Sequence, residues 1–233
     1  MLKTCVIIPT YNEEENIGNL VRALLTLPLG LDVLVVDDGN DKTTEIVTAI
    51  SQTDPRVSVL RRGEKGGRGS AVMAGLRHCL EKGYERFVEM DADFSHDPKE
   101  LESLLAVSAP RVVVIGSRYL ATSRIIGWPW KRTIFSKAAN LFARPWLRIP
   151  IHDFTNGYRV YDREAAALLV TAPIKSKGYI VLSEIAYLLK KHGFRFVEVP
   201  TVFVNRTRGA SNFNLSEIQD ALFGILRIPF NHR

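Results

Sequence analysis

Short apolar runs alternate with helical patterns along the first half of the chain, and this alternation constrains the fold most. The apolar runs have the length of buried strands, and the segments between them carry apolar residues at helical spacing. This order is typical of parallel strands that are joined by right-handed helical crossovers. We therefore expect an α/β fold with a doubly wound, mostly parallel, Rossmann-like sheet.

Periodicity assigns the individual elements. Strands are expected at residues 4–8, 33–36, 57–60, 87–91 and 112–115, with two short ones flanking Pro200. Helices are expected at residues 17–25, 42–52, 71–80 and 180–191, and from 214 onward. Another helix has Asp97 as its N-cap, Pro98 in its first turn and Glu100 completing the cap. Residues 118–148 are basic and aromatic, and prolines interrupt them, so no regular element is assigned there.

The expected sheet places several polar segments at one edge. Ligands of doubly wound sheets bind beyond the carboxyl ends of the strands. Four strand ends therefore converge on one crevice, and they contribute residues 9–13, Asp37 and Asp38, the Gly-rich basic loop 61–70, and residues 91–93.

Two of these crevice residues, Asp91 and Asp93, form a pair of carboxylates separated by one residue. Mg²⁺ and Mn²⁺ prefer oxygen ligands and are usually held by one or two carboxylates together with substrate phosphates. An ion in that position neutralises a leaving diphosphate. The simpler alternative is a solvated acidic turn before the next helix.

Length and composition limit the class of protein. The 233 residues, 46% hydrophobic and 24% charged, fit one globular domain with an appended subregion. Cys5 and Cys79 have no metal spacing, so a reducing compartment is expected. The sequence has no secretory leader and no apolar run of roughly 20 residues, so we expect that the chain does not cross a membrane.

Positive charge is concentrated in one stretch. Residues 103–152 contain no Asp or Glu, eight Lys or Arg, and all three tryptophans, Trp128, Trp130 and Trp146. Basic residues interleaved with aromatic ones suit an anionic membrane surface. Nucleic acid is a competing partner, and a solvated basic face with a partly buried tryptophan cluster is the simplest alternative. We expect this stretch to contact an anionic membrane surface, and we expect no nucleic-acid partner.

Five motifs occur together and in order along the chain: VIIPTYNE at 6–13, VVDDG at 35–39, MDAD at 90–93, GSRY at 116–119 and RTRG at 206–209. With them the chain resembles the inverting GT-A glycosyltransferases of family 2 over nearly its whole length. The motif WPWKR at 128–132 and Phe135-Ser136-Lys137 favour the branch that transfers mannose to dolichyl or other polyprenyl phosphates.

The resemblance implies a single GT-A domain over residues 1–233. Residues 1–117 would bind the nucleotide sugar, and 118–233 would bind the acceptor and the membrane interface. It assigns substrate contacts to Pro9, Tyr11 and Glu13 at the base, Asp38 at the nucleoside, Lys65 and Ser136, and it assigns Asp91 and Asp93 to the metal, Mg²⁺ or Mn²⁺, and the diphosphate. The residues alone leave alternatives open. Glu13 could be a first-turn acid favoured by the helix dipole, and Asp37 could be a strand-end cap.

The resemblance also implies the reaction, which is inverting transfer from GDP-mannose to a polyprenyl or dolichyl phosphate on the cytosolic face of a membrane. A phosphate monoester is already anionic near neutral pH, so it needs orientation more than a base. Arginine forks suit that task. The expected catalytic residues are Asp93, Arg118, Arg132 and Arg208. Glu184 is weighed as a base against a core-edge residue paired with an arginine.

Other functions stay open at this point. The donor could be a UDP-sugar such as UDP-glucose. The chain could also be a non-catalytic nucleotide-binding module, although the presence of both metal carboxylates argues against this. A membrane-embedded partner subunit could complete the enzyme.

Overall fold

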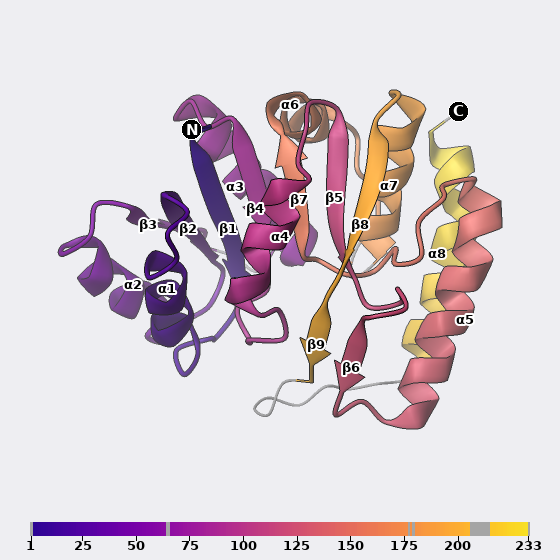
Figure 1. Ribbon diagram of the computed structural model, residues 1–233, viewed down its shortest axis with the longest axis horizontal. Coiled ribbons are helices and arrows are strands. Elements are labelled where there is room, and N and C mark those ends of the chain that lie inside the picture. The colour runs from indigo at the N-terminus through magenta and orange to yellow at the C-terminus, as the bar shows by residue number, and fades with distance from the viewer. Residues whose placement is uncertain (1, 64–65, 177, 179, 206–214, 233) are drawn as a thin grey trace.

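The computed structural model describes residues 2–63, 66–176, 178, 180–205 and 215–232, with the side chains of 215–222 left undescribed. A seven-stranded sheet of order β3-β2-β1-β4-β7-β5-β8 runs through it (Figure 1). All its strand pairs are parallel except those of β7, which is antiparallel to β4 and β5. Its strands are β1 (Thr4–Thr10), β2 (Leu31–Asp37), β3 (Val57–Arg61), β4 (Arg86–Glu89), β5 (Val112–Ser117), β7 (Arg159–Asp162) and β8 (Arg195–Pro200).

A second, two-stranded sheet lies below the main sheet in Figure 1. The carboxyl end of β1 points toward the same side of the picture. The second sheet pairs β6 (Arg124–Ile126) with β9 (Val202–Val204) in parallel. The helices are α1 (Ile17–Leu25), α2 (Thr43–Ser51), α3 (Arg68–Glu81), the 3₁₀ helix η1 (Pro98–Glu100), α4 (Leu101–Ala106), α5 (Trp130–Leu147), α6 (Arg163–Thr171), α7 (Ile180–Lys191) and α8 (Leu215–Asn231).

Both faces of the main sheet are covered, as a doubly wound sheet requires. Val6 and Ile8 of β1 pack in one core with residues of α1, α2 and α4. Cys5 and Ile7 pack in a second core with residues of α3, α6 and α7. Successive side chains of a strand point to opposite faces, so one apolar run supplies both cores. The expected fold class is confirmed.

Most expected elements are present, with shifts at their ends. The strand expected to end at Asp91 ends at Glu89, and α3 begins at Arg68, inside the expected loop. Asp97 is an N-cap, and its carboxylate accepts the Lys99 N–H at 3.0 Å. The prediction for Glu100 is wrong, because its carboxylate accepts the Val202 N–H at 2.7 Å and binds the Thr201 hydroxyl instead of closing the cap.

Four elements were not predicted: β6, α5, β7 and α6. The strand β7 and the helix α6 follow one another, and β7 lies between β4 and β5 through pairing that only the tertiary fold specifies. The helix α5 continues through Pro145 and ends at Arg148, whose φ is +55°. Pro145 removes one N–H donor and crowds the carbonyl of Leu141, four residues before it. Buried Asn140, Ala143 and Leu147 anchor the helix on both sides of this position.

The helices α5 and α8 lie side by side at one edge of the molecule, beyond β8 and α7 (Figure 1). Within the described ranges, no helix has the combination of length and apolarity that crossing a bilayer requires.

Candidate active site

The ends of β1 and β2 are joined by one buried carboxylate. Asp37 accepts the Thr10 hydroxyl at 2.8 Å, the Gly39 N–H at 3.0 Å and the Thr44 hydroxyl at 2.6 Å. Its contacts therefore link two strands to the start of α2. The interpretation of Asp37 as a strand-end cap is confirmed.

The neighbouring carboxylate, Asp38, is paired with an arginine that sequence reasoning did not single out. Arg62 donates to Asp38 from Nε at 2.6 Å and from Nη2 at 2.5 Å, and the Gly66 N–H adds a bond of 3.0 Å. The Asp38 side chain is only 4% exposed. A nucleoside that binds here would share this carboxylate with Arg62. In the sequence, the only feature that pointed to Arg62 was its position in the basic Gly-rich loop.

The segment after β1 holds the three residues expected at the base. Pro9 is in β1, whereas Tyr11 is 45% exposed. Glu13 donates its N–H to the Thr43 hydroxyl at 3.0 Å, and its carboxylate accepts from the Asn16 amide at 2.9 Å. Since α1 begins at Ile17, the interpretation of Glu13 as a first-turn acid is wrong.

Asp91 lies just beyond β4 and binds Arg68, the first residue of α3. Nε of Arg68 is 2.8 Å from Oδ1 of Asp91, and a second guanidinium nitrogen contacts buried Glu89. Burial opposes ionisation of Asp91, but the attraction of Arg68 outweighs it, so the pKa of Asp91 is lowered. Asp93 is partly exposed, and its Oδ1 accepts the Ser95 N–H at 3.1 Å.

This donor set fits a hard divalent ion only in part. Among the described residues, no group of three or more His, Cys, Asp or Glu side chains is arranged to hold a metal. Asp91 and Asp93 would therefore supply two oxygen donors, and the remaining ligands would be phosphate and water, an arrangement common for Mg²⁺.

His96 holds the backbone of Asp91 in place through a hydrogen bond. It is fully buried, its Nδ1 accepts the Asp91 N–H at 3.2 Å, and its ring stacks on Tyr158 with centroids 4.9 Å apart. Because Nδ1 accepts, Nε2 carries the proton and donates to Asn156 at 2.7 Å. Both ring nitrogens are thus occupied, so His96 positions the loop. Its place beside the two aspartates was the only signal in the sequence.

Arg118 is also buried, and it is clasped by a carboxylate that sequence reasoning missed. Nε and Nη2 of Arg118 each lie 2.7 Å from Asp153, and Nη2 also lies 2.7 Å from Thr155. Burial opposes ionisation of Asp153, but Arg118 outweighs it and lowers the pKa of that carboxyl. In the sequence, Asp153 is the first acidic residue after the acid-free stretch, and this position was the signal that it pairs with an arginine of that stretch. Asp153 also accepts the Asn156 N–H at 3.1 Å, and Asn156 binds His96, so a chain of hydrogen bonds links Arg118 to Asp91.

The ring of Trp128 connects Arg118 to Arg132. The Arg118 guanidinium is 5.2 Å from the Trp128 ring, and that of Arg132 is 4.1 Å from the same ring. The Tyr119 hydroxyl bonds Ser136 at 2.5 Å. We call these five residues the acceptor cluster. Two other expected site residues, Lys65 and Arg208, lie outside the described residues.

Glu184 is fully buried on α7. It accepts the N–H groups of Lys175 and Ser176 and binds Nε2 of His232 at 2.6 Å. Burial raises the pKa of Glu184, but these hydrogen bonds outweigh it and lower the pKa. It is therefore a core residue, as one interpretation held, although its partner is a histidine and not the expected arginine.

Comparison with known proteins extends this description. The model of glycosyl transferase family 2 matches residues 5–169. Polyprenol monophosphomannose synthase of Mycolicibacterium smegmatis is 42% identical, with 96% of this chain and 85% of that protein covered. Undecaprenyl-phosphate mannosyltransferase of Micrococcus luteus is 37% identical, with 97% and 93% covered.

Solved structures resemble the fold at low sequence identity. Glucosyl-3-phosphoglycerate synthase of Mycobacterium tuberculosis, solved with Mn²⁺, UDP and glucosyl-3-phosphoglycerate, has a TM-score of 0.68 and 18% identity, covering 99% of this chain and 79% of that one. Mannosyl-3-phosphoglycerate synthase of Rubrobacter xylanophilus has a TM-score of 0.67 and 20% identity, covering 100% and 74%.

The mostly parallel, doubly wound sheet with its strand-end carboxylates is therefore a GT-A fold, the architecture of a glycosyltransferase. The chain belongs to glycosyl transferase family 2.

Proposed function

We propose that this protein transfers mannose from GDP-mannose to a polyprenyl phosphate, with inversion and with Mg²⁺ or Mn²⁺ held by Asp91 and Asp93. The names and coverage of the two curated relatives support the sugar and the acceptor. One observation in the structure carries the mechanism: hydrogen bonds run from Asp91 through His96, Asn156 and Asp153 to Arg118, a member of the acceptor cluster. Donor and acceptor groups can therefore meet there.

The acceptor cluster supports a phosphate nucleophile. The second pKa of a phosphate monoester is about 6, so the attacking oxygen is already anionic at neutral pH. Because Asp153 holds the Arg118 fork, Arg132 and the Ser136 hydroxyl are the groups that would orient the phosphate, while Arg118 supplies a fixed positive field. A bound divalent ion would stabilise the departing diphosphate. The buried position of Glu184 fits a reaction without a protein base.

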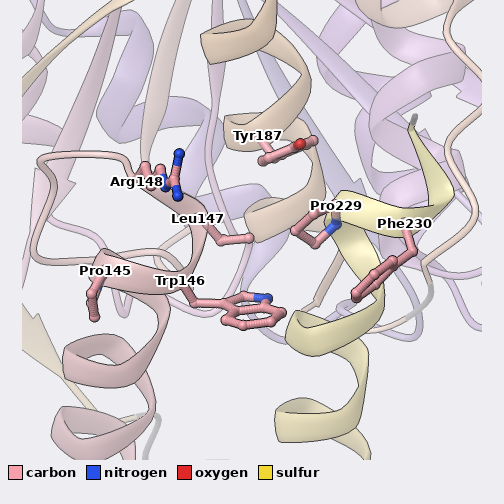
Figure 2. A pocket seen from close by; sticks show the side chains of 7 residues that line it. All are labelled: Pro145, Trp146, Leu147, Arg148, Tyr187, Pro229 and Phe230. Atoms are coloured by element: carbon pink, nitrogen blue, oxygen red, sulfur yellow. The ribbon is translucent and has the colours of Figure 1, made fainter.

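The α5–α8 face supports action at a membrane surface. Lys131, Lys137, Arg144 and Arg148 are exposed along α5. At one end of the face, Trp146 and Phe230 point toward each other across a pocket of about 370 Å³ (Figure 2). Aromatic rings with arginines beside them suit the headgroup region of an anionic bilayer, so we place the enzyme peripherally on a cytosolic membrane face. The exposed apolar residues of this face are Trp130, Ile134, Phe135, Leu141, Phe142, Trp146, Phe223 and Phe230.

A transfer assay tests the proposal. Purified protein is incubated with undecaprenyl phosphate, Mn²⁺ and either GDP-mannose or UDP-glucose. We expect a mannosyl lipid of inverted anomeric configuration with GDP-mannose, and no product with UDP-glucose. Asp93→Asn should lower the rate by about a hundredfold or more, because it removes a carboxylate ligand of the ion that would neutralise the departing diphosphate. Glu102→Gln, an exposed carboxylate on α4, is the matched control and should keep full activity.

Each other outcome identifies a different error. Transfer only from UDP-glucose would make the donor assignment wrong. Binding of nucleotide without transfer to the lipid would favour the non-catalytic module. Activity that survives Asp93→Asn and a chelator would contradict the metal-dependent mechanism.

A further inference from the structure

Arg68 is a cation built into the site beside the carboxylates proposed to hold the metal. It is the first residue of α3, and Gly67 before it has a φ of +82°. Its Nε and Nη2 lie 2.8 and 2.7 Å from Oδ1 of Asp91, and its Nη1 pairs with Glu89. Only 19% of its side chain is exposed. The guanidinium is therefore fixed between two carboxylates.

The surroundings of Arg68 hold it in that place. Glu89 is 2% exposed, and its other carboxylate oxygen accepts the Tyr161 hydroxyl at 2.9 Å. On the remaining side, the guanidinium lies against Gly157, where a Cβ would come within 1.9 Å of Nη2. Only a glycine leaves room for it. Arg68 thus has one defined position, which is shared between Glu89 and Asp91.

We propose that Arg68 is a positioning residue that occupies Oδ1 of Asp91, leaves Oδ2 for the divalent ion, and sets the affinity for that ion together with Glu89. This inference rests on the proposed function, because it takes Asp91 and Asp93 as the metal ligands. Arg68 has no assigned part in binding substrate. It acts through Asp91, by fixing the carboxylate and by placing one positive charge beside the ion.

The charges make this proposal specific. Asp91, Asp93 and Glu89 are three acidic groups, and Arg68 offsets one of them, so the charge that remains matches a divalent ion. Glu89 does not join Asp91 and Asp93 in a metal-binding group of three among the described residues, so it acts on the ion through charge and through Arg68. A charge at this range changes ion affinity strongly in a partly buried site.

A purely structural role for Arg68 makes the opposite prediction. If Arg68 and Glu89 were only a buried ion pair that holds α3 on β4, then losing either partner would loosen the site and weaken ion binding. If Arg68 tunes the ion, then removing the arginine and removing the glutamate change the affinity in opposite directions.

The experiment is a charge series measured by Mn²⁺ electron paramagnetic resonance at pH 8, with Mn²⁺ alone and with saturating GDP. We expect Arg68→Gln to tighten Mn²⁺ binding by about tenfold and Glu89→Gln to weaken it by about tenfold. The double variant restores the net charge and should bind within about threefold of the wild type. Weaker binding in both single variants, or no change in either, would overturn the proposal.

Two controls keep the result interpretable. Circular dichroism melting checks each variant, and if Arg68→Gln does not fold, Arg68→Lys replaces it. This variant keeps the charge but loses the planar fork between Asp91 and Glu89, so charge tuning predicts Mn²⁺ binding within about threefold of the wild type, and clearly weaker binding would overturn the proposal. Asp91→Asn separates this inference from the proposed function. Absence of Mn²⁺ binding in the wild type, or unchanged binding in Asp91→Asn, would refute the metal site itself.

Discussion

At the scale of single residues, charged groups of the candidate site occur as pairs whose partners are distant in the chain. Arg62 binds Asp38, Arg68 binds Asp91, and Arg118 binds Asp153. A charge that is removed from water needs such a partner, since an unpaired one is costly. These pairs fix the carboxylates and arginines before any substrate arrives. They also make the stability of the fold depend on pH.

The pair of Arg118 and Asp153 gives a prediction about pH. The pKa of Asp153 in the folded protein lies below the ordinary value, which is about 3.9 in an unfolded chain. The stabilisation is therefore fully present above about pH 4 and is lost as the pH falls through the native pKa. Asp153→Asn should lower the free energy of unfolding near pH 7 by about 3–5 kcal/mol, because it leaves Arg118 buried without a counter-charge.

Urea unfolding followed across pH 2–7 measures this effect. The acid-side slope of stability should be shallower in Asp153→Asn than in the wild type. Asp54→Asn is the matched control, since Asp54 pairs with Arg56 at the surface and little change is expected. A loss equal to that of the control would show that the buried pair does not stabilise the fold.

At the scale of elements, α5 and α8 matter because neither buries its apolar residues completely. Leu141 of α5 is 74% exposed and Phe223 of α8 is 60% exposed, although the two helices contact each other. Exposed apolar residues in one patch on two adjacent helices mark an interaction surface. The basic residues of α5 favour an anionic membrane as that partner.

Liposome cosedimentation tests the α5–α8 face. The protein should bind vesicles that contain anionic lipid and come off as salt rises, because screening acts over about 8 Å at physiological ionic strength. Replacing Trp130 and Leu141 by serine should weaken binding by about tenfold, since both large apolar side chains leave the interface. Val107→Ser, which removes an exposed apolar residue from the segment after α4, should have no effect. Equal binding to neutral and anionic vesicles would contradict the electrostatic part, and preferential binding to DNA would favour the rival partner.

At the scale of the whole molecule, one sheet joins the two halves of the chain. The strand β5 of residues 1–117 lies between β7 and β8, which both come from residues 118–233. Without them β5 would have no neighbours in the main sheet. We therefore propose that the nucleotide half and the acceptor half form one cooperative domain.

Urea unfolding with one probe in each half tests this proposal. All three tryptophans lie in residues 118–233, and both cysteines, Cys5 and Cys79, are buried in residues 1–117. Tryptophan fluorescence and thiol reactivity should give the same midpoint, because one cooperative transition exposes both. Two separate midpoints would mean that the halves unfold independently.

The sequence by itself determined the features that depend on local chemistry. Apolar periodicity located β1, β2, β3, β5 and α7, and the rule for strand ends correctly assigned Asp37, Asp38 and Asp91 to the same edge of the sheet. The tertiary structure decided what depends on pairing across the chain. It inserted the antiparallel strand β7 into the sheet, buried Glu184 with His232, and chose Arg62, Arg68 and Asp153 as partners for the crevice residues. The physical reason is that a charge or a strand edge specifies the kind of partner that it needs, whereas packing decides which of many suitable residues comes within reach.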